Sequence, residues 1–232
     1  MNFKIIYAFI IFISSSLIMS YANEKGVKIK LKPIYFKEEN LKFLLERRYS
    51  NRDFQDKPLN LEDVSNILWA SGGKKYDSVT AATRTIPSAG ATYPLELYLV
   101  SGGNAVNKLK AGIYRYSVEE HSLELTSEGD KRAELAEACL GQDFIQNAPV
   151  SLVIAAKFQR TTQRYGSRGE RYVYMEAGHA CQNIYLAVTC LGLSTVEVGA
   201  FFDDKVSRVL NLDKDYIPLS VMPIGYAKSW GR

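Results

Sequence analysis

Residues Glu46–Phe54 read ERRYSNRDF and place three arginines, one serine and two aromatic residues within nine positions. The stretch follows a segment with the leucine spacing of an amphipathic helix. Arg48, Ser50 and Arg52 alternate, so they point the same way if the chain is extended after that helix. Two guanidinium groups and a hydroxyl on one side suit a phosphate dianion. A solvated basic turn is the alternative, and the stretch alone does not decide between them.

Composition favours one large globular domain. The chain has 232 residues, of which 47% are hydrophobic and 23% charged, which is ordinary for such a protein. The net charge of +4 is mild and evenly spread, so nucleic acid is not an expected partner. We predict a lead-in over residues 23–45 and the folded domain over residues 46–232.

Residues 1–22, MNFKIIYAFIIFISSSLIMSYA, have an early lysine, an apolar run and a small-residue end. This pattern predicts a secretory signal peptide, and the alternative is an uncleaved membrane anchor. No twin arginine precedes the apolar run, which favours the Sec route and a periplasmic or secreted protein. After cleavage we expect no stable membrane association.

The cysteines and histidines do not indicate a metal site. Cys139, Cys181 and Cys190 lie in helix-like stretches without metal-ligand spacing, so buried free thiols are expected. With only His121 and His179, a metal centre built by the protein is not predicted.

Hydrophobic periodicity predicts helices at 38–48, 61–71, 130–140, 168–191 and 203–210. It predicts strands at 95–101, 112–118, 122–125, 150–157, 195–198 and 219–225, with a polar lead-in at 28–37 and a loop at 74–87. The mixture lacks a regular βαβ repeat and therefore predicts an α+β fold. Apolar and small residues surround much of the 168–191 helix, so it is expected to be central and nearly encircled.

Three further segments suggest ligand or backbone contacts. TIPSAGATYP (85–94) has small residues and two prolines, typical of a rigid loop that a flat ligand could approach, or simply of a loop that feeds a strand. EAGHACQN (176–183) has Gly178, which would let another backbone come near. VEVGAF (196–201) runs from a strand into a turn whose amides could meet a ligand heteroatom. Each segment is weak evidence alone.

Taken together and in order, these segments resemble one family. The segments that show the resemblance are RRYSNRDF, RTIPSAGATYPLELYLV, GIYRYSVEEHSLEL, LGQDFIQNAPVSLVIAAKF, RYGSRGERYVYMEAGHACQNIYLAVTCLGL, VGAFFDD and PIGYA. The chain resembles FMN-dependent oxidoreductases of the nitroreductase fold, most closely the SagB-type dehydrogenase branch that includes thiazoline/oxazoline oxidases. The resemblance runs from about residue 46 to residue 226. It implies an α+β fold with a central, mostly antiparallel sheet flanked by helices, in an intertwined homodimer with two FMN sites.

The resemblance also implies site residues. Contacts to the FMN phosphate and ribityl chain match Arg48, Ser50 and Arg52. The loop that closes over the isoalloxazine from the other subunit matches Pro87, Ser88, Ala89 and Gly90, and the backbone near flavin N5 and O4 matches Val198, Gly199 and Ala200. A basic residue near the C-terminus, Arg232 or Lys228, is expected at the phosphate.

In the azoline-oxidising branch a basic residue followed by tyrosine is associated with substrate deprotonation, and Arg164-Tyr165 stands in that place. Arginine does not lose its proton near pH 7, which leaves Tyr165 as a candidate to orient substrate or donate a proton. A packing tyrosine in a loop is the alternative. His179 is expected to be a packed helix residue rather than a catalyst, because the flavin carries the chemistry.

The resemblance implies an FMN enzyme with ping-pong hydride transfer through flavin N5, between a reductant such as NAD(P)H and a small-molecule acceptor. The predicted signal peptide implies that this enzyme is exported. Because NAD(P)H is scarce outside the cytoplasm, the donor is left open. One alternative is an azoline dehydrogenase of a peptide-modifying system, with oxygen as acceptor. Another is a non-catalytic flavin- or ligand-binding protein.

Overall fold

A computed structural model describes residues 27–36, 40–77 and 81–229. The predicted signal peptide and Arg232 lie outside these residues. Within the described ranges, no helix has the length and apolar character needed to cross a membrane.

Seven strands form one sheet in the order β1-β6-β5-β4-β7-β9-β8, and every neighbouring pair is antiparallel. The strands are β1 (Lys28–Lys30), β4 (Leu95–Ser101), β5 (Gly112–Ser117), β6 (Ser122–Glu128), β7 (Val150–Ala156), β8 (Ser194–Thr195) and β9 (Ile217–Gly225). The helices are α1 (Leu41–Arg47), α2 (Leu61–Ala70), α3 (Arg132–Ala138), α4 (Asp143–Asn147), α5 (Gln159–Tyr165), α6 (Arg168–Cys190) and α7 (Asp203–Leu210). The predicted α+β fold with an antiparallel sheet flanked by helices is confirmed.

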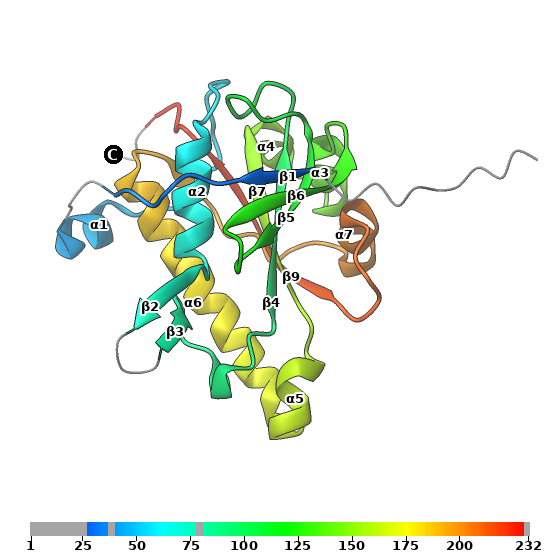
Figure 1. Cartoon of the computed structure of the whole chain (residues 1–232). Helices are drawn as coiled ribbons and strands as arrows, with labels where there is room; N and C mark the ends of the chain where they lie inside the picture. The colour runs from blue at the N-terminus through cyan, green and yellow to red at the C-terminus, as the bar shows by residue number, and fades with distance from the viewer. Residues whose placement is uncertain (1–26, 37–39, 78–80, 230–232) are drawn as a thin grey trace, which may run out of the picture.

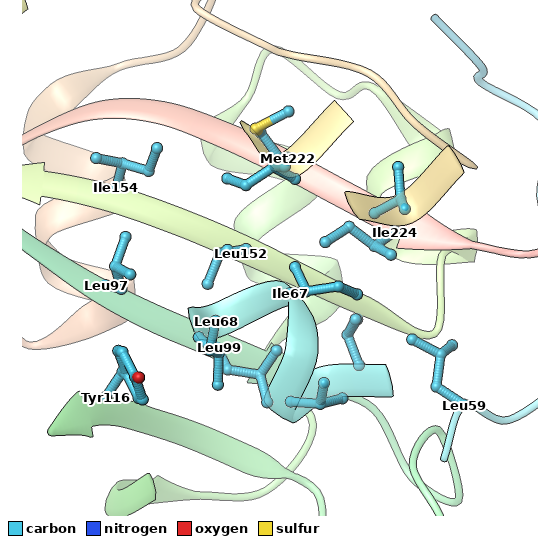
Figure 2. Packing of buried hydrophobic residues seen from close by; sticks show 14 of the residues in the cluster. Leu59, Ile67, Leu68, Leu97, Leu99, Tyr116, Leu152, Ile154, Met222 and Ile224 are labelled. Atoms are coloured by element: carbon cyan, nitrogen blue, oxygen red, sulfur yellow. The ribbon is translucent and has the colours of Figure 1, made fainter. Parts of the chain in front are cut away.

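The sheet is buried on both faces because apolar residues of its central strands point to both sides. On β7, Leu152 and Ile154 pack into the core that contains α2 and α6. Val153 and Ala155 point the other way, into the core that contains α3, α4 and α7. Figure 1 shows these two layers on either side of the sheet. Figure 2 shows Leu152 beside Ile67 and Leu68 of α2, with Ile154 farther along β7. A continuous apolar run is the expected signature of a strand covered on both faces.

The long helix α6 is not encircled, contrary to the sequence prediction. Its buried apolar positions, Val173, Ala177, Ala180, Ile184 and Val188, recur every three or four residues and therefore form one stripe. The opposite face is exposed and consists of Tyr174, Met175, Gly178, His179 and Gln182. His179, expected to be a packed helix residue, is exposed within this one chain.

Residues 74–87 are not the loop that was predicted. They contain the antiparallel hairpin of β2 (Lys74–Asp77) and β3 (Ala81–Arg84). Lys74, Lys75 and Tyr76 of β2 are exposed, so hydrophobic periodicity does not report this strand.

Other predicted boundaries shifted or missed elements. Helix α1 begins at Leu41 because the Asn40 side chain accepts a hydrogen bond from the Lys42 amide (2.8 Å). The strand predicted at 195–198 is Ser194–Thr195, and Val198 forms only an isolated bridge with Val221. The short elements α4, α5 and β1 were not predicted, since each has too few residues to show a period.

Candidate flavin site

The ERRYSNRDF stretch lies between two other segments of the chain. Ser50 forms a parallel bridge with Thr195, and the Asn51 amide donates to the Thr195 carbonyl (2.9 Å). On its other side the stretch pairs with the C-terminal segment, where the Gln55 amide donates to the Tyr226 carbonyl (2.8 Å). The stretch after α1 is therefore extended, as the alternation of its polar side chains requires.

Tyr185 on α6 contacts Arg48, Ser50 and the Glu197 amide. Its hydroxyl lies 3.0 Å from Ser50 Oγ and accepts a hydrogen bond from the Glu197 amide (2.8 Å). The Arg48 guanidinium lies over its ring, with Cζ 5.1 Å from the centroid, within the range of a cation–π contact. Arg48 and Ser50 thus share one side of the extended stretch, and Tyr185 ties that side to the residues before Val198.

Arg52 lies on the same stretch, farther from α1. Its Cζ is 5.8 Å from the centroid of the Phe144 ring on α4. Gln142, which precedes α4, donates from Nε2 to the Ala200 carbonyl (3.1 Å). Both ends of the arginine stretch are therefore linked, through Tyr185 and through the start of α4, to the predicted Val198–Ala200 segment.

Arg48 and Arg52 have no carboxylate partner among the described residues. The nearest charge pair is Lys228 Nζ with Asp53 Oδ1 (2.9 Å), and the Lys228 amide also donates to the Asp53 carbonyl (3.1 Å). Of the two predicted C-terminal cations, Lys228 is thus placed beside the arginine stretch. Two guanidinium groups without an acid favour a bound anion.

The Val198–Ala200 segment offers exposed backbone. Val198 is fixed to Val221 by two hydrogen bonds of 2.9 and 3.0 Å. Beyond it Gly199 and Ala200 are exposed, and a Cβ built at Gly199 would meet no atom within 4 Å. A flat ligand can therefore approach this backbone closely, and the residues present fit a phosphorylated flavin.

The predicted Pro87–Gly90 loop is at the other end of α6, next to α5. Gly90 has φ of 58°, and a Cβ there would lie 2.5 Å from the Tyr165 hydroxyl oxygen and 2.7 Å from Arg164 Nη1. The positive φ therefore favours glycine at this position. Arg164 Nη1 donates to the Gly90 carbonyl (2.9 Å). Arg164-Tyr165 thus contacts the loop, and Tyr165 is the last residue of a helix rather than part of a loop.

Glu176 on α6 lies near the same loop. It is 3% exposed. Burial raises the pKa of Glu176 to about 7, although the neighbouring polar groups of Ser88 and Ala89 act in the opposite direction.

The two groups of predicted residues do not meet within one chain. Tyr185 and Glu176 are separated by nine positions on α6, which is roughly 13.5 Å along the helix axis at 1.5 Å per residue. The arginine stretch and the Val198–Ala200 segment are brought together, whereas the Pro87–Gly90 loop lies apart with Arg164 and Tyr165.

Sequence reasoning missed Tyr185 and Glu176 as site residues. A signal for Glu176 was available, because it falls on the α6 stripe whose other members are apolar, and a buried carboxylate needs a partner. Tyr185 looks like an ordinary aromatic residue of the same helix, and only the fold shows that its hydroxyl connects Ser50 with the Glu197 amide.

Comparison with known proteins places this antiparallel sheet, covered on both faces, among FMN-type oxidoreductases. The family model "Nitroreductase family" matches residues 45–226, and the chain belongs to this family, whose members generally bind flavin. The predicted resemblance, including its SagB-type branch, is confirmed.

Individual relatives agree with this assignment. The Methanocaldococcus jannaschii protein "Putative nitroreductase MJ1384" is 45% identical over 188 residues, which cover 81% of this chain and 91% of that protein. The Rhizobium leguminosarum bv. trifolii "Trifolitoxin-processing protein TfxB" is 31% identical over 161 residues, covering 65% of this chain and 43% of that protein. A crystal structure described as a nitroreductase from Ralstonia eutropha JMP134 has a TM-score of 0.74 and 30% identity, covering 87% of this chain and 90% of that one.

Proposed function

We propose that this chain binds FMN and transfers hydride equivalents between a reductant such as NAD(P)H and a small-molecule acceptor in ping-pong fashion. One observation carries the proposal. Arg48 and Arg52 flank Ser50 on an extended segment, and neither has a carboxylate partner among the described residues. This is the chemistry of a receptor for a terminal phosphate.

In this proposal each part of the site has a defined task. Arg48 and Arg52 bind the phosphate, and Ser50 contacts the ribityl chain or the phosphate. Lys228 lies beside them but is paired with Asp53, so it would reach the phosphate only by leaving that pair. The Gly199 and Ala200 backbone lies against the polar edge of the ring. When bound, FMN would supply the redox chemistry by accepting and returning a hydride at N5. The protein holds the ring and excludes water.

Tyr165 is proposed to face the substrate. Its ring contacts the Tyr172 ring edge-on, with centroids 5.2 Å apart, and its hydroxyl lies against Gly90 of the loop. From there it can orient a substrate or donate a proton. Arg164 is committed to the Gly90 carbonyl and remains charged near pH 7, so it does not act as a base.

The complete site is proposed to need two chains, because the Pro87–Gly90 loop and the arginine stretch lie apart in one chain. A second copy would place its loop over this chain's flavin. From the sequence, a second copy is expected to pack near Gly178 and Ala180, but Ala180 is fully buried in its own chain. Gly178 lies on the exposed face of α6, where a Cβ would meet nothing within 4 Å.

Gly178→Leu therefore tests the two-chain site without disturbing the fold of one chain. We expect the wild type to scatter light as a dimer and to retain FMN, and the variant to lose both properties. Gly103→Leu is a matched control, since a Cβ there also meets nothing within 4 Å. A monomeric wild type with stoichiometric FMN would contradict the two-chain site.

The redox proposal is tested by purifying residues 23–232 and recording the visible spectrum with and without NAD(P)H. We expect flavin bands that bleach with a donor and return when an acceptor is added. Bound flavin that no donor reduces would instead favour the non-catalytic alternative.

Azoline oxidation is a second candidate, because one relative is named a trifolitoxin-processing protein. It would run from substrate to flavin with oxygen as the acceptor. A reconstituted reaction on an azoline-bearing peptide distinguishes it, since oxygen consumption should then need no NAD(P)H.

Export to the periplasm or the medium is likewise proposed from residues 1–22. Cell fractionation with N-terminal sequencing tests it, and a mature protein that begins at Asn23 is the expected result. An unprocessed protein in the cytoplasm would contradict export.

A further inference from the structure

Residues 87–94, which begin with the Pro87–Gly90 loop, have an unfavourable backbone conformation. Gly90, Ala91 and Tyr93 are left-handed, with φ of 58°, 54° and 46°, and the last two carry side chains that disfavour this region. Tyr93 also lines a cavity of about 390 Å³, so close packing does not hold the segment on that side. Contacts from other parts of the chain must therefore maintain this conformation.

The short helix α5 supplies two of these contacts. Arg164 Nη1 donates to the Gly90 carbonyl (2.9 Å). Thr161 Oγ1 lies 2.8 Å from Thr92 Oγ1, and Thr161 is buried. Thr161 and Arg164 are three positions apart, so they lie on the same side of the helix. In Figure 1, the segment between β3 and β4 lies beside α6 and close to α5.

Arg160, four positions before Arg164, supplies a third contact and connects α5 to the sheet. Its Nη1 donates to the Tyr93 carbonyl (3.0 Å). Its Nη2 lies 2.8 Å from Glu96 Oε1 and donates to the Tyr216 hydroxyl (3.0 Å). Glu96 belongs to β4 and Tyr216 directly precedes β9. Because α5 is tied to both strands, it can hold the segment in a fixed place.

We propose that Arg160, Thr161 and Arg164 of α5 are positioning residues, which hold the Pro87–Gly90 loop in the conformation that covers the flavin of the partner subunit. The proposal rests on the flavin site proposed above. The three side chains contact the segment itself, so they act on the flavin through the loop. Their hydrogen bonds exist before flavin binds, which lowers the conformational entropy that the loop loses when it closes over FMN. A loop held in this way should release FMN slowly.

Hydrogen–deuterium exchange of the flavin-free protein tests the contacts directly. Arg164→Ala removes an exposed side chain, so the fold should persist. We expect the amides of residues 87–94 to exchange at least about threefold faster than in the wild type, because local opening becomes easier when a hydrogen bond is lost. Thr161→Val should act in the same direction, since it removes the hydroxyl but keeps the shape of the side chain.

Gln163→Ala, at the neighbouring exposed position of α5, is the matched control and should leave the exchange of residues 87–94 unchanged. The amides of β7 should exchange at the wild-type rate in every variant, which would show that the sheet is intact. Unchanged exchange of residues 87–94 in both Arg164→Ala and Thr161→Val would overturn the proposal.

The rate of FMN release connects these contacts to the flavin. Stopped-flow fluorescence should show FMN leaving Arg164→Ala about 3- to 10-fold faster than the wild type, the equivalent of one net hydrogen bond. Gln163→Ala should release FMN as the wild type does. Arg164→Lys should restore slow release, because lysine keeps an N–H donor for the Gly90 carbonyl.

Faster exchange of residues 87–94 with an unchanged rate of FMN release would overturn the proposal, since the α5 contacts would then serve the fold alone. Release from Arg164→Lys as fast as from Arg164→Ala would also contradict it. If the wild type binds no FMN, the flavin part of the proposal fails together with the proposed function, whereas the exchange rates still decide whether α5 holds the loop.

Discussion

Two groups of arginines in this chain have opposite surroundings. Around the cavity, Arg160 pairs with Glu96 (2.8 Å) and Arg84 pairs with Glu119 (3.2 Å). In the stretch after α1, Arg48 and Arg52 lie over aromatic rings, and among the described residues neither meets a carboxylate. The density of arginines is similar, but only the first group is neutralised by the protein itself.

The difference separates a structural role from a binding role. A guanidinium paired with a carboxylate has its donors and its charge satisfied, so it contributes modestly to folding and offers little to a ligand. Two guanidiniums that no described carboxylate pairs leave uncompensated positive charge in the free protein. A bound dianion can compensate that charge, so the unpaired group is the one expected to determine ligand affinity.

The largest effect is expected from removing the unpaired group. Arg48→Ala and Arg52→Ala should each weaken FMN binding by roughly 1.5–3 kcal/mol, the range for a hydrogen bond to a charged group. Arg→Lys at either position should recover only part of the loss, because an ammonium group lacks the planar pair of N–H donors that a guanidinium offers to a phosphate. Fluorescence titration with FMN measures both.

Arg115→Ala is the matched control from the paired group, since Arg115 pairs with Glu124 (2.7 Å). It should leave FMN affinity unchanged and lower the free energy of unfolding by no more than about 1 kcal/mol. If the control weakened FMN as much as Arg48→Ala does, the distinction between the two groups would fail.

A smaller effect is expected at the residue that organises the unpaired group. Tyr185→Phe keeps the ring under Arg48 but removes the hydroxyl that joins Ser50 to the Glu197 amide. We expect FMN binding to weaken by about 1 kcal/mol, the net value of a neutral hydrogen bond. Tyr172→Phe, at the other end of α6, is the control. Equal FMN affinities in the two variants would contradict the role of Tyr185.

The smallest effect is a pH dependence of stability that comes from His121. His121 Nδ1 lies 2.8 Å from the Tyr116 hydroxyl, and its Nε2 lies 2.8 Å from Ser65 Oγ. Burial lowers the pKa of His121, so the folded protein binds fewer protons than the unfolded chain. The stabilisation is therefore present above the ordinary pKa near 6.5 and decreases as the pH falls below it.

Melting temperatures at pH 5.5 and 7.5 test this dependence in wild type and His121→Gln. The variant should lose the part of the acid destabilisation that His121 causes. Glu176 acts in the opposite direction, because a raised pKa favours the folded state at low pH, but both proteins share that contribution. His179→Gln, at an exposed histidine, should behave as the wild type.

The parts of the fold that sequence could predict are those with a strong period. The β4 boundaries at 95 and 101 and the α7 boundaries at 203 and 210 agree with the structure, and the apolar run of β7 is buried throughout. The β2–β3 hairpin was missed because the described side chains of β2 are exposed. The α6 helix was misjudged because composition does not show which positions share a face.

The candidate site was predictable only in part. The alternation of polar residues in ERRYSNRDF correctly indicated that Arg48 and Ser50 lie on one side of the stretch, because both contact Tyr185 in the structure. The absence of an acid beside Arg48 cannot be read from the sequence, because Asp53 and Glu46 are both nearby along the chain. In the structure Asp53 pairs with Lys228 and Glu46 with Lys42, and these pairings depend on the fold.

The most direct test compares FMN with riboflavin, which lacks the phosphate, in wild type and in the Arg48→Ala/Arg52→Ala double variant. The wild type should prefer FMN by at least roughly 100-fold, the equivalent of two charged hydrogen bonds. In the double variant that preference should nearly vanish, while riboflavin affinity stays the same. A wild type that binds riboflavin as tightly as FMN, or a preference that survives the loss of both arginines, would contradict the phosphate role of this stretch.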